Sequence, residues 1–408
     1  MSVNTAKEKT IALEKKGVTI PHPEAVYIDE AVDIANISGN GVVLHGGTKL
    51  FGGATFIHDH TVIGREGAVT IDNCQIGSHV RIASGAYTDA VFLDHASLGY
   101  GSHVRAGTIL EEHASIAHTV GLKQTILFPY VTLGSLINFC DCLMAGGSGK
   151  AAHSEVGSSY IHFNFTANQD KATPSIFGDV PKGVMLKERP IFLGGQGGLV
   201  GPCRLAYGTV VAAGTIVRKD ELRPNRLIFG GNPAAGNMAM GERITQNVKK
   251  ILTNNFYYIG NLIALKNYYT DIRSLFVSPG FPEPLHQGLL DKVTLGIRER
   301  VKRLRGFGEK IRAARDATPY TLSKYEQAVT DHWPDVESYL LKFCDTSFAD
   351  DNQEAFIKQM HHAMDRHGQE YMTVITHLDT NAAEAGTAWL QKIVDHVIDG
   401  ACQAAKIS

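Results

Sequence analysis

Apolar residues recur every six positions through much of the first half of the chain. Four places after each apolar residue of the longer run stands a residue that is mostly small, such as Ala96, Ser102 or Thr108. A period of six matches neither the period of a helix nor the alternation of a half-buried strand. It predicts a left-handed parallel β-helix of about 18 residues per turn, with one hexad on each of three flat faces. The two longest runs are Phe92, Leu98, Val104, Leu110, Ile116, Leu122 and Phe128, and then Leu193, Leu199, Leu205, Val211 and Val217.

The six-residue rhythm breaks over 134–192, where the polar stretch SSYIHFNFTANQDKATPS (158–175) predicts a loop that leaves the coil. The prolines and glycines of LRPNRLIFGGNPAAG (222–236) indicate the exit from the coil. Apolar residues beyond it mostly follow steps of three and four, which predicts helices from Ile244 onward. The fold class is therefore mainly β with α. We predict an N-terminal cap over 1–40, a β-helix over 41–236 and an α-helical domain over 237–408, with helices near 286–315, 321–345, 352–367 and 380–404.

Composition and charge exclude several classes of protein and partner. Apolar residues make up 44% and charged residues 20% of the 408 residues, which argues against a mostly disordered chain. The formal net charge is -2, so we expect no nucleic-acid partner and no membrane partner. The start of the chain has no apolar core of signal-peptide length, and no window resembles a membrane span. The six cysteines are scattered without a CxxC pair, and we expect a cytoplasmic protein with reduced thiols.

One pair of basic residues has the spacing of a coil turn. Arg105 and Lys123 are 18 residues apart and hold the second place of their hexads, so they should stack on adjacent turns, about 4.8 Å apart. An Arg and a Lys at one spot suit a phosphate or another anion. The alternative is a solvated pair that is bridged to acids such as Glu111 or Glu112.

Histidines also recur at turn spacing. His95 and His113 are 18 apart in the near-repeats DHAS and EHAS, and His79 takes the same hexad place two turns before His113. Together with His118, the residues His79 and His113 form a candidate zinc triad that is shared between subunits. The alternative, which we adopt, is surface stacking of imidazoles on neighbouring turns without a metal.

Two further histidines flank the irregular stretch. His153 in KAAHSEVG and His162 in YIHFNF are candidate general bases, because imidazole titrates near neutral pH. His162 lies between Ile161 and Phe163. If this strand alternates, its ring points away from those apolar groups, toward solvent or a groove.

A glycine-rich run, 194–198, offers backbone N–H groups to a phosphate or an oxyanion, with Gly195, Gly197 and Gly198 as candidates. It is not followed by Lys-Ser/Thr, so it is not a P-loop.

The segment RAGTILEEHASIAHTVGLKQT (105–125) resembles the acetyltransferase β-helix of the bifunctional N-acetylglucosamine-1-phosphate uridyltransferase/glucosamine-1-phosphate acetyltransferase family. The segment FLGGQGGLVGPCRLAYGTVVAAGTIV (192–217) looks like the final coils of that family. GGNPA (230–234) resembles the close of many hexapeptide acyltransferases. The resemblance implies that Arg105 and Lys123 hold a sugar phosphate.

The same resemblance implies a reaction and an assembly. Gly195 and Ala213 match positions on the family's acetyl-CoA groove, so acetyl-CoA or another acyl-CoA would be the co-substrate. The acceptor would be an amino sugar, as a sugar phosphate or a nucleotide sugar related to UDP-N-acetylglucosamine biosynthesis. Because three such coils usually pack together in this fold family, we expect a homotrimer.

Two departures from the family pattern bear on activity. Residues 1–40 are too short for the family's nucleotidyltransferase domain and lack its glycine-rich loop. An alignment with a four-residue insertion places Phe139 where the family has its catalytic His. Either another histidine, His153 before His162, acts as the base, or acetyl transfer is lost.

Two other functions stay open. The spacing of His79, His113 and His118 resembles that of γ-class carbonic anhydrases, which implies a zinc-dependent lyase, although the Arg-Gly-Asp of that class does not occur in this chain. The third hypothesis is a non-catalytic scaffold that binds a nucleotide sugar.

Overall fold

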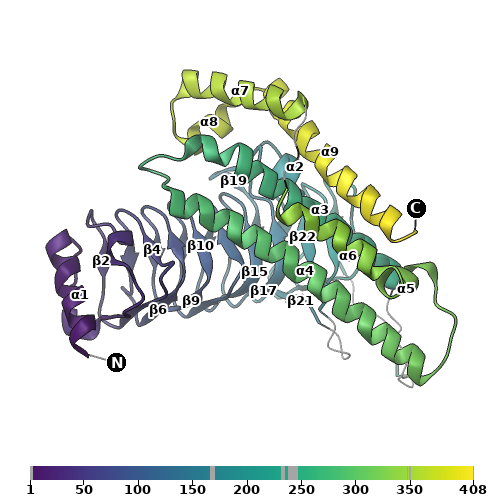
Figure 1. Ribbon diagram of the computed structural model, residues 1–408, viewed down its shortest axis with the longest axis horizontal. Helices are drawn as coiled ribbons and strands as arrows, with labels where there is room; N and C mark the ends of the chain where they lie inside the picture. The colour runs from purple at the N-terminus through teal and green to yellow at the C-terminus, as the bar shows by residue number, and fades with distance from the viewer. Residues whose placement is uncertain are drawn as a thin grey trace.

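The chain folds into a parallel β-helix followed by a region of helices. Strands of the coil extend over residues 27–228. Figure 1 shows the coil with α1 (Val3–Lys16) at its N-terminal end and the later helices along one side of it. The predicted fold class is confirmed. The computed structural model describes residues 3–165, 171–230, 235–237, 247–346, 348 and 351–407.

The apolar residue of each hexad points into the coil. Leu98, Val104 and Leu110 come from three consecutive strands and are all buried. Residues 18 apart pair in register on adjacent turns, as Ser97 does with Ser115. The six-residue period therefore sets a continuous apolar core along the coil axis, as the pattern predicts.

We name the three faces of the coil A, B and C. In each turn the chain passes from face C to face A, then to face B and back to face C. Faces B and C belong to one sheet, because the strands β15 (Gly121–Leu127) and β17 (Asn138–Met144) extend over both. Face A comprises β2 (Val43–Leu44), β5 (Val62–Ile63), β8 (Arg81–Ile82), β11 (Ser97–Leu98), β14 (Ser115–Ile116), β16 (Thr132–Leu133), β20 (Glu155–Val156), β23 (Phe192–Leu193), β26 (Val210–Val211) and β28 (Leu227–Ile228). Face B comprises β1 (Tyr27–Ile28), β3 (Thr48–Phe51), β6 (Val69–Asp72), β9 (Gly85–Thr88), β12 (Ser102–Val104), β21 (Ile161–Phe163), β24 (Gly198–Val200) and β27 (Ile216–Val217). Face C comprises β4 (Phe56–Ile57), β7 (Gln75–Ile76), β10 (Ala90–Phe92), β13 (Thr108–Leu110), β22 (Ser175–Phe177) and β25 (Cys203–Leu205).

Helix α1 closes the N-terminal end of the coil. The Lys9 ammonium donates to the backbone carbonyls of Asp29, Glu30 and Val32. The Lys16 ammonium does the same for three carbonyls between residues 34 and 37. The two lysines thus satisfy carbonyl groups that no further turn of the coil could pair.

Two long helices cover face C. Helices α3 (Val248–Asp271) and α4 (Glu283–Ala317) pack on it, α4 over β7, β10 and β13 and α3 over β22. The outward-pointing Val91, Ile109 and Ile176 of this face are consequently buried. Helix α1 contacts β1, the first strand of face B, and no other described helix packs on faces A or B to the extent that α3 and α4 pack on face C.

The remaining helices build on α3 and α4. Helix α9 packs against α3, α6 and α7. The predicted helical segments agree with α3, α4, α5, α6, α7 and α9, whereas α8 was not predicted, and Ile244 lies outside the described residues. None of the described helices is long and apolar enough to cross a membrane. All six cysteines are free. The bounds are α5 (Lys324–Val329), α6 (Trp333–Leu341), α7 (Asp351–His367), α8 (Tyr371–His377) and α9 (Thr380–Ala404).

Candidate functional site

The candidate residues lie on three different corners of the coil, which we name CA, AB and BC after the faces that meet there. At the CA corner, aromatic rings from successive turns stack in parallel. The ring centroids are 4.7 to 4.8 Å apart between the histidines and 5.2 Å apart at the last step. Each ring belongs to a residue with φ between 56° and 69°. The predicted stacking of His95 and His113 is thus present, and it is part of a longer ring column, made of His60, His79, His95, His113 and Tyr130.

The third histidine of the candidate zinc triad is on another corner. His118 follows the face-A strand β14 and is exposed at the AB corner, next to Thr119. A single chain therefore does not bring His118 to His79 and His113. Within the described residues, no group of three His, Cys, Asp or Glu side chains is placed to hold a metal ion.

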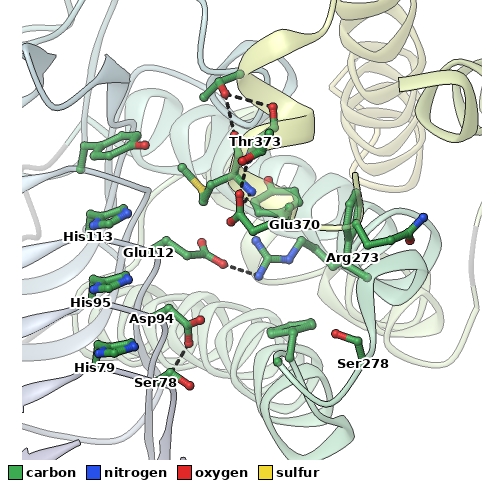
Figure 2. A pocket seen from close by; sticks show the side chains of 18 of the residues that line it. Ser78, His79, Asp94, His95, Glu112, His113, Arg273, Ser278, Glu370 and Thr373 are labelled. Atoms are coloured by element: carbon green, nitrogen blue, oxygen red, sulfur yellow. Dashed lines mark hydrogen bonds and ion pairs between the residues drawn. The ribbon is translucent and has the colours of Figure 1, made fainter. Parts of the chain in front are cut away.

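A cleft of about 930 Å³ opens between the ring column and the helical region (Figure 2). One wall carries His79, His95 and His113. The opposite wall comes from η3 (Arg273–Phe276), the loop after it and the start of α8, where Glu370 lies.

Asp94 and Glu112, which precede His95 and His113, line the cleft as well. Burial raises the pKa of Asp94 to about 6, and its Oδ1 accepts a hydrogen bond from the Ser78 backbone N–H. Burial, with the charge of Lys150, lowers the pKa of His113 to about 4, and burial also lowers the pKa of His95. At neutral pH these two imidazoles are therefore uncharged.

A buried ionic cluster joins this corner to the helices. The Arg273 guanidinium lies 2.5 Å from Glu112 Oε1 and stacks on the rings of Tyr371 and Phe281, with its central carbon 3.7 and 4.7 Å from the ring centroids. The Tyr269 hydroxyl donates to the adjacent Glu111.

These contacts also exclude one interpretation of the basic pair. Glu111 and Glu112 are engaged with Tyr269 and Arg273 at the CA corner. Bridging of Arg105 and Lys123 to these two glutamates is therefore excluded, and a solvated pair remains the alternative to an anion site.

Arg105 and Lys123 lie together at the BC corner, on adjacent turns. Arg105 is exposed, and its Nη2 donates to Cys140 Sγ at 3.3 Å. Cys140 pairs in register with Lys123 on the next turn and contacts Asn138 Oδ1 at 3.5 Å. Three consecutive turns thus contribute to one outward-facing spot with two cations.

A buried ion pair fixes the chain beside this spot. The Arg300 guanidinium of α4 lies 2.6 Å from Asp141 Oδ1, and it also donates to the Lys171 carbonyl at 3.3 Å. The Asn164 amide donates to Asp141 Oδ2 at 3.1 Å. One end of the irregular stretch is therefore bonded to α4, through Lys171, and the other to Asp141 of β17, through Asn164. Residues 166–170 lie outside the described residues.

The orientation predicted for His162 is wrong. Ile161 and Phe163 point outward and are 42% and 37% exposed, whereas His162 is 3% exposed inside the coil. Its Nδ1 is 2.6 Å from the Cys140 carbonyl oxygen and its Nε2 is 2.8 Å from Ser175 Oγ. Burial lowers the pKa of His162 to about 4. Its ring is a polar core group with both nitrogens occupied.

His153, the other candidate base, and Phe139, which aligns with the family's catalytic His, do not lie beside Arg105 and Lys123 either. His153 lies on the hairpin of β18 (Gly147–Gly149) and β19 (Ala152–His153) at the CA corner, with Nδ1 2.9 Å from the Lys150 carbonyl oxygen. Phe139 is fully buried in the coil, edge-on to Tyr160. A side chain at position 139 points into the core, so a base could not act from that position.

The glycine-rich run turns the AB corner. The Gly198 N–H donates to the Thr215 carbonyl at 3.1 Å, so this amide belongs to the coil ladder and is not free for a ligand. Adjacent turns are very close here: a Cβ on Gly194 would lie 2.4 Å from the Ala213 nitrogen. Close packing of turns therefore explains glycine in this run, and Gly195, Gly197 and Ala213 lie on this corner, away from Arg105.

The sequence reasoning missed the helical wall of the cleft. Arg273 and Glu370 are far along the chain from the coil, and nothing near them in the sequence indicates their partners. A signal for the coil wall was available, because the near-repeats that place His95 and His113 also place Asp94 and Glu112 one residue before them.

Comparison with known proteins supports relatedness over the coil. No protein-family model matches the chain. The bifunctional protein GlmU of Geotalea uraniireducens (strain Rf4) is 28% identical over 223 residues, 54% of this chain and 43% of that protein. GlmU of Thermotoga petrophila (strain ATCC BAA-488 / DSM 13995 / JCM 10881 / RKU-1) is 28% identical over 213 residues, 51% of this chain and 41% of that protein. The chain thus spans less than half the length of these curated relatives.

The similarity to solved structures is too low to support a conclusion about this chain. The polySia-specific acetyltransferase NeuO has 11% identity and a TM-score of 0.15 over 57% of this chain and 89% of its own. The polysialic acid O-acetyltransferase OatWY has 14% identity and a TM-score of 0.17 over 56% and 92%. The sequence comparison and the observed coil together show that the β-helix half of this chain is a hexapeptide-repeat β-solenoid distantly homologous to the GlmU proteins.

Proposed function

We propose that the β-helix half is an acyltransferase module that moves an acyl group from acyl-CoA to the amine of a sugar phosphate or nucleotide sugar. The observation that carries this proposal is the pair Arg105 and Lys123, which faces outward at the BC corner within the segment that resembles the acetyltransferase coil. Two cations on adjacent turns are suited to a phosphate group. The homology to GlmU over this half supports the same assignment.

The reaction requires groups from more than one corner. The amine nitrogen attacks the thioester carbonyl and forms the C–N bond of the amide while the C–S bond breaks. A base takes the amine proton and passes it to the leaving sulfur, so CoA leaves as the thiol. Within one chain, the glycine corner AB and the basic corner BC lie at opposite edges of face B. A neighbouring coil would therefore have to contribute to the site beside Arg105 and Lys123, which is why we propose a homotrimer.

Face A supports association with further copies. Phe192, Val210 and Leu227 lie in register on three successive turns and are 40%, 40% and 62% exposed. Contiguous exposed apolar side chains are typical of a surface that binds another protein. Light scattering on the purified chain should give a mass near three chains, and a monomer at micromolar concentration would contradict a shared site.

The proposed base is His153, because the ring of His162 is buried with both nitrogens occupied. His153 is on the CA corner of its own chain, so it too would act on a neighbouring chain's acceptor. A thiol-release assay with acetyl-CoA and a series of amino-sugar phosphates and nucleotide sugars tests this. His153→Ala should lower kcat at least about 100-fold if it is the base.

A second function is favoured by a specific observation. Neither Phe139 nor His162 places a free base beside the cationic spot, so the coil could bind a phosphorylated sugar without acyl transfer. Absence of thiol release with every acceptor, combined with binding of phosphorylated sugars, would establish this scaffold function.

Phosphate binding is tested directly. Arg105→Ala and Lys123→Ala should each weaken binding of glucosamine-1-phosphate by about 1.5–3 kcal/mol, because the contacts are charge-assisted. The double variant should lose less than the sum, because both cations hold one phosphate. Lys49→Ala, an exposed cation on face B at the other end of the coil, is the control. Unchanged affinity in both single variants would contradict the anion site.

A further inference from the structure

The cleft at the CA corner is separate from the basic pair. It lies between the ring column and the helical region, whereas Arg105 and Lys123 are on the BC corner of the same coil. Its volume of about 930 Å³ is within the range of small-molecule sites. Its walls come from two parts of the chain that are far apart in sequence, and Figure 2 shows both walls converging on one space.

The coil wall presents both hydrogen-bond donors and acceptors. His79 and His95 are exposed, so the edges of their stacked rings are accessible. The neutral imidazoles of His95 and His113 each offer one N–H donor and one nitrogen acceptor. The Asp94 carboxyl adds an acceptor beside them.

The helical wall is also polar. Glu370 uses its carboxylate to cap α8, accepting hydrogen bonds from the backbone N–H groups of Met372 and Thr373 at 3.0 and 2.6 Å. Lys150 from the hairpin adds a donor at the edge of the cleft. Glu112 belongs to the coil wall, where Oε1 is paired with Arg273 and Oε2 is buried.

These features together select a ligand class. Three carboxyl groups face the cleft against two cations, one of which, Arg273, is already paired with Glu112, so the cleft does not suit a phosphate. The ring planes of the column are parallel within 6° from His79 to His113, so their nitrogens do not converge on one metal ion. A ligand whose groups both donate and accept satisfies the mixed lining, and hydroxyl groups do both.

We propose that the CA cleft is a carbohydrate-binding site that takes an uncharged saccharide, with its hydroxyl groups bonded to the edges of the ring column and to Asp94 on one side and to Glu370 on the other. The site is independent of the acyl-acceptor site proposed at the BC corner. The chain would then carry two sugar-binding sites of different chemistry, one for a phosphorylated sugar and one for a neutral sugar.

The experiment uses the full chain on an array of neutral, amino and acidic mono- to tetrasaccharides, and each hit is titrated calorimetrically. His95→Asn removes the ring from the coil wall while keeping a residue type that tolerates positive φ. Glu370→Gln removes the charge from the opposite wall and keeps a capping oxygen. We expect each change to weaken binding of a neutral saccharide about three- to tenfold or more.

His60→Asn is the matched control. His60 has the same backbone conformation and stacks on His79 at 4.7 Å, but it lies outside the cleft. Its substitution shortens the ring column without changing a residue that lines the cleft, so the affinity for the neutral saccharide should stay unchanged. Circular dichroism of all three variants establishes that each one is folded.

The other outcomes overturn the proposal. In the first, the wild type binds no neutral saccharide at concentrations up to about 10 mM. In the second, it binds a neutral saccharide, but both cleft variants bind it with unchanged affinity. A third is binding of phosphorylated sugars alone, abolished by Arg105→Ala. That last result would leave the acyl-acceptor site supported while removing the carbohydrate site of the cleft, so the two proposals fail separately.

Discussion

Arg273 is the residue whose removal should most weaken the attachment of the helices to the coil. Its side chain is 1% exposed, and that of its partner Glu112 is 9% exposed. The guanidinium also lies between the rings of Tyr371 and Phe281. Replacing it in Arg273→Met keeps much of the apolar stem but leaves Glu112 buried without its cation, next to Glu111.

The cost of such a change follows from desolvation. Removing one partner of a buried ion pair costs about 3–5 kcal/mol, because the remaining charge is neither solvated nor paired. At a urea dependence of about 2 kcal/mol/M, this corresponds to a fall of about 1.5–2.5 M in the unfolding midpoint. In the double variant with Glu112→Gln, the loss should be smaller than the sum of the two single losses.

Tryptophan fluorescence in urea measures this loss selectively. The chain has two tryptophans, Trp333 on α6 and Trp389 on α9, so the signal reports the helical region. The control is Arg305→Ala, which removes an ion pair with Glu337 whose arginine is 50% exposed, and which should cost no more than about 1 kcal/mol. If Arg273→Met costs no more than this surface variant, the idea that the ion pair holds the helices on the coil is refuted.

Two further predictions concern pH and packing. Burial and the charge of Glu112 raise the pKa of Glu111 to about 8, so the folded chain keeps a proton that the unfolded chain loses near pH 4–5. Stability should therefore fall as pH rises from about 5 to 8, by at most about 1.4 kcal/mol per unit, and Glu111→Gln should flatten urea midpoints across this range. A Cβ on Gly308 of α4 would lie 1.8 Å from the Val329 carbonyl oxygen, whereas one on Gly306 would meet nothing within 4 Å. Gly308→Ala should cost about 1–3 kcal/mol and Gly306→Ala should gain about 0.5–1 kcal/mol, as thermal unfolding would show; equal effects would contradict the packing.

The coil could be predicted because its signal is local and repeated. Each hexad places an apolar residue inward, and spacing alone then sets which residues stack, as with Arg105 and Lys123 or His95 and His113. His162 shows the limit of a shorter pattern. Its two apolar neighbours predicted that its ring points outward. His162 pairs in register with Leu199, however, which holds an inward hexad position, so the ring points inward. Over several turns, coil register outweighs local polarity when the buried group finds partners.

The helical cover of face C was not predicted, although part of its signal is visible. Strands such as β10, β13 and β22 are buried on both sides, with Val91, Ile109 and Ile176 apolar at positions that would otherwise face water. This pattern indicates that something covers the face, but not which segment does. The decisive contacts join residues far apart in sequence, such as Arg273 with Glu112 and Arg300 with Asp141, and no periodicity relates them.

The position of the helices determines how the proposed functions depend on assembly. Because α3 and α4 cover face C, a second copy can reach the coil itself at faces A and B. The glycine-rich corner lies between these two faces, and the basic pair lies at the far edge of face B. In a trimer with parallel coil axes, packing of one chain's face A against the next chain's face B would bring the CA corner with His153 beside the neighbour's basic pair, so acyl transfer should require the oligomer. Saccharide binding in the cleft uses one chain alone and should persist at dilutions where acyl transfer is lost.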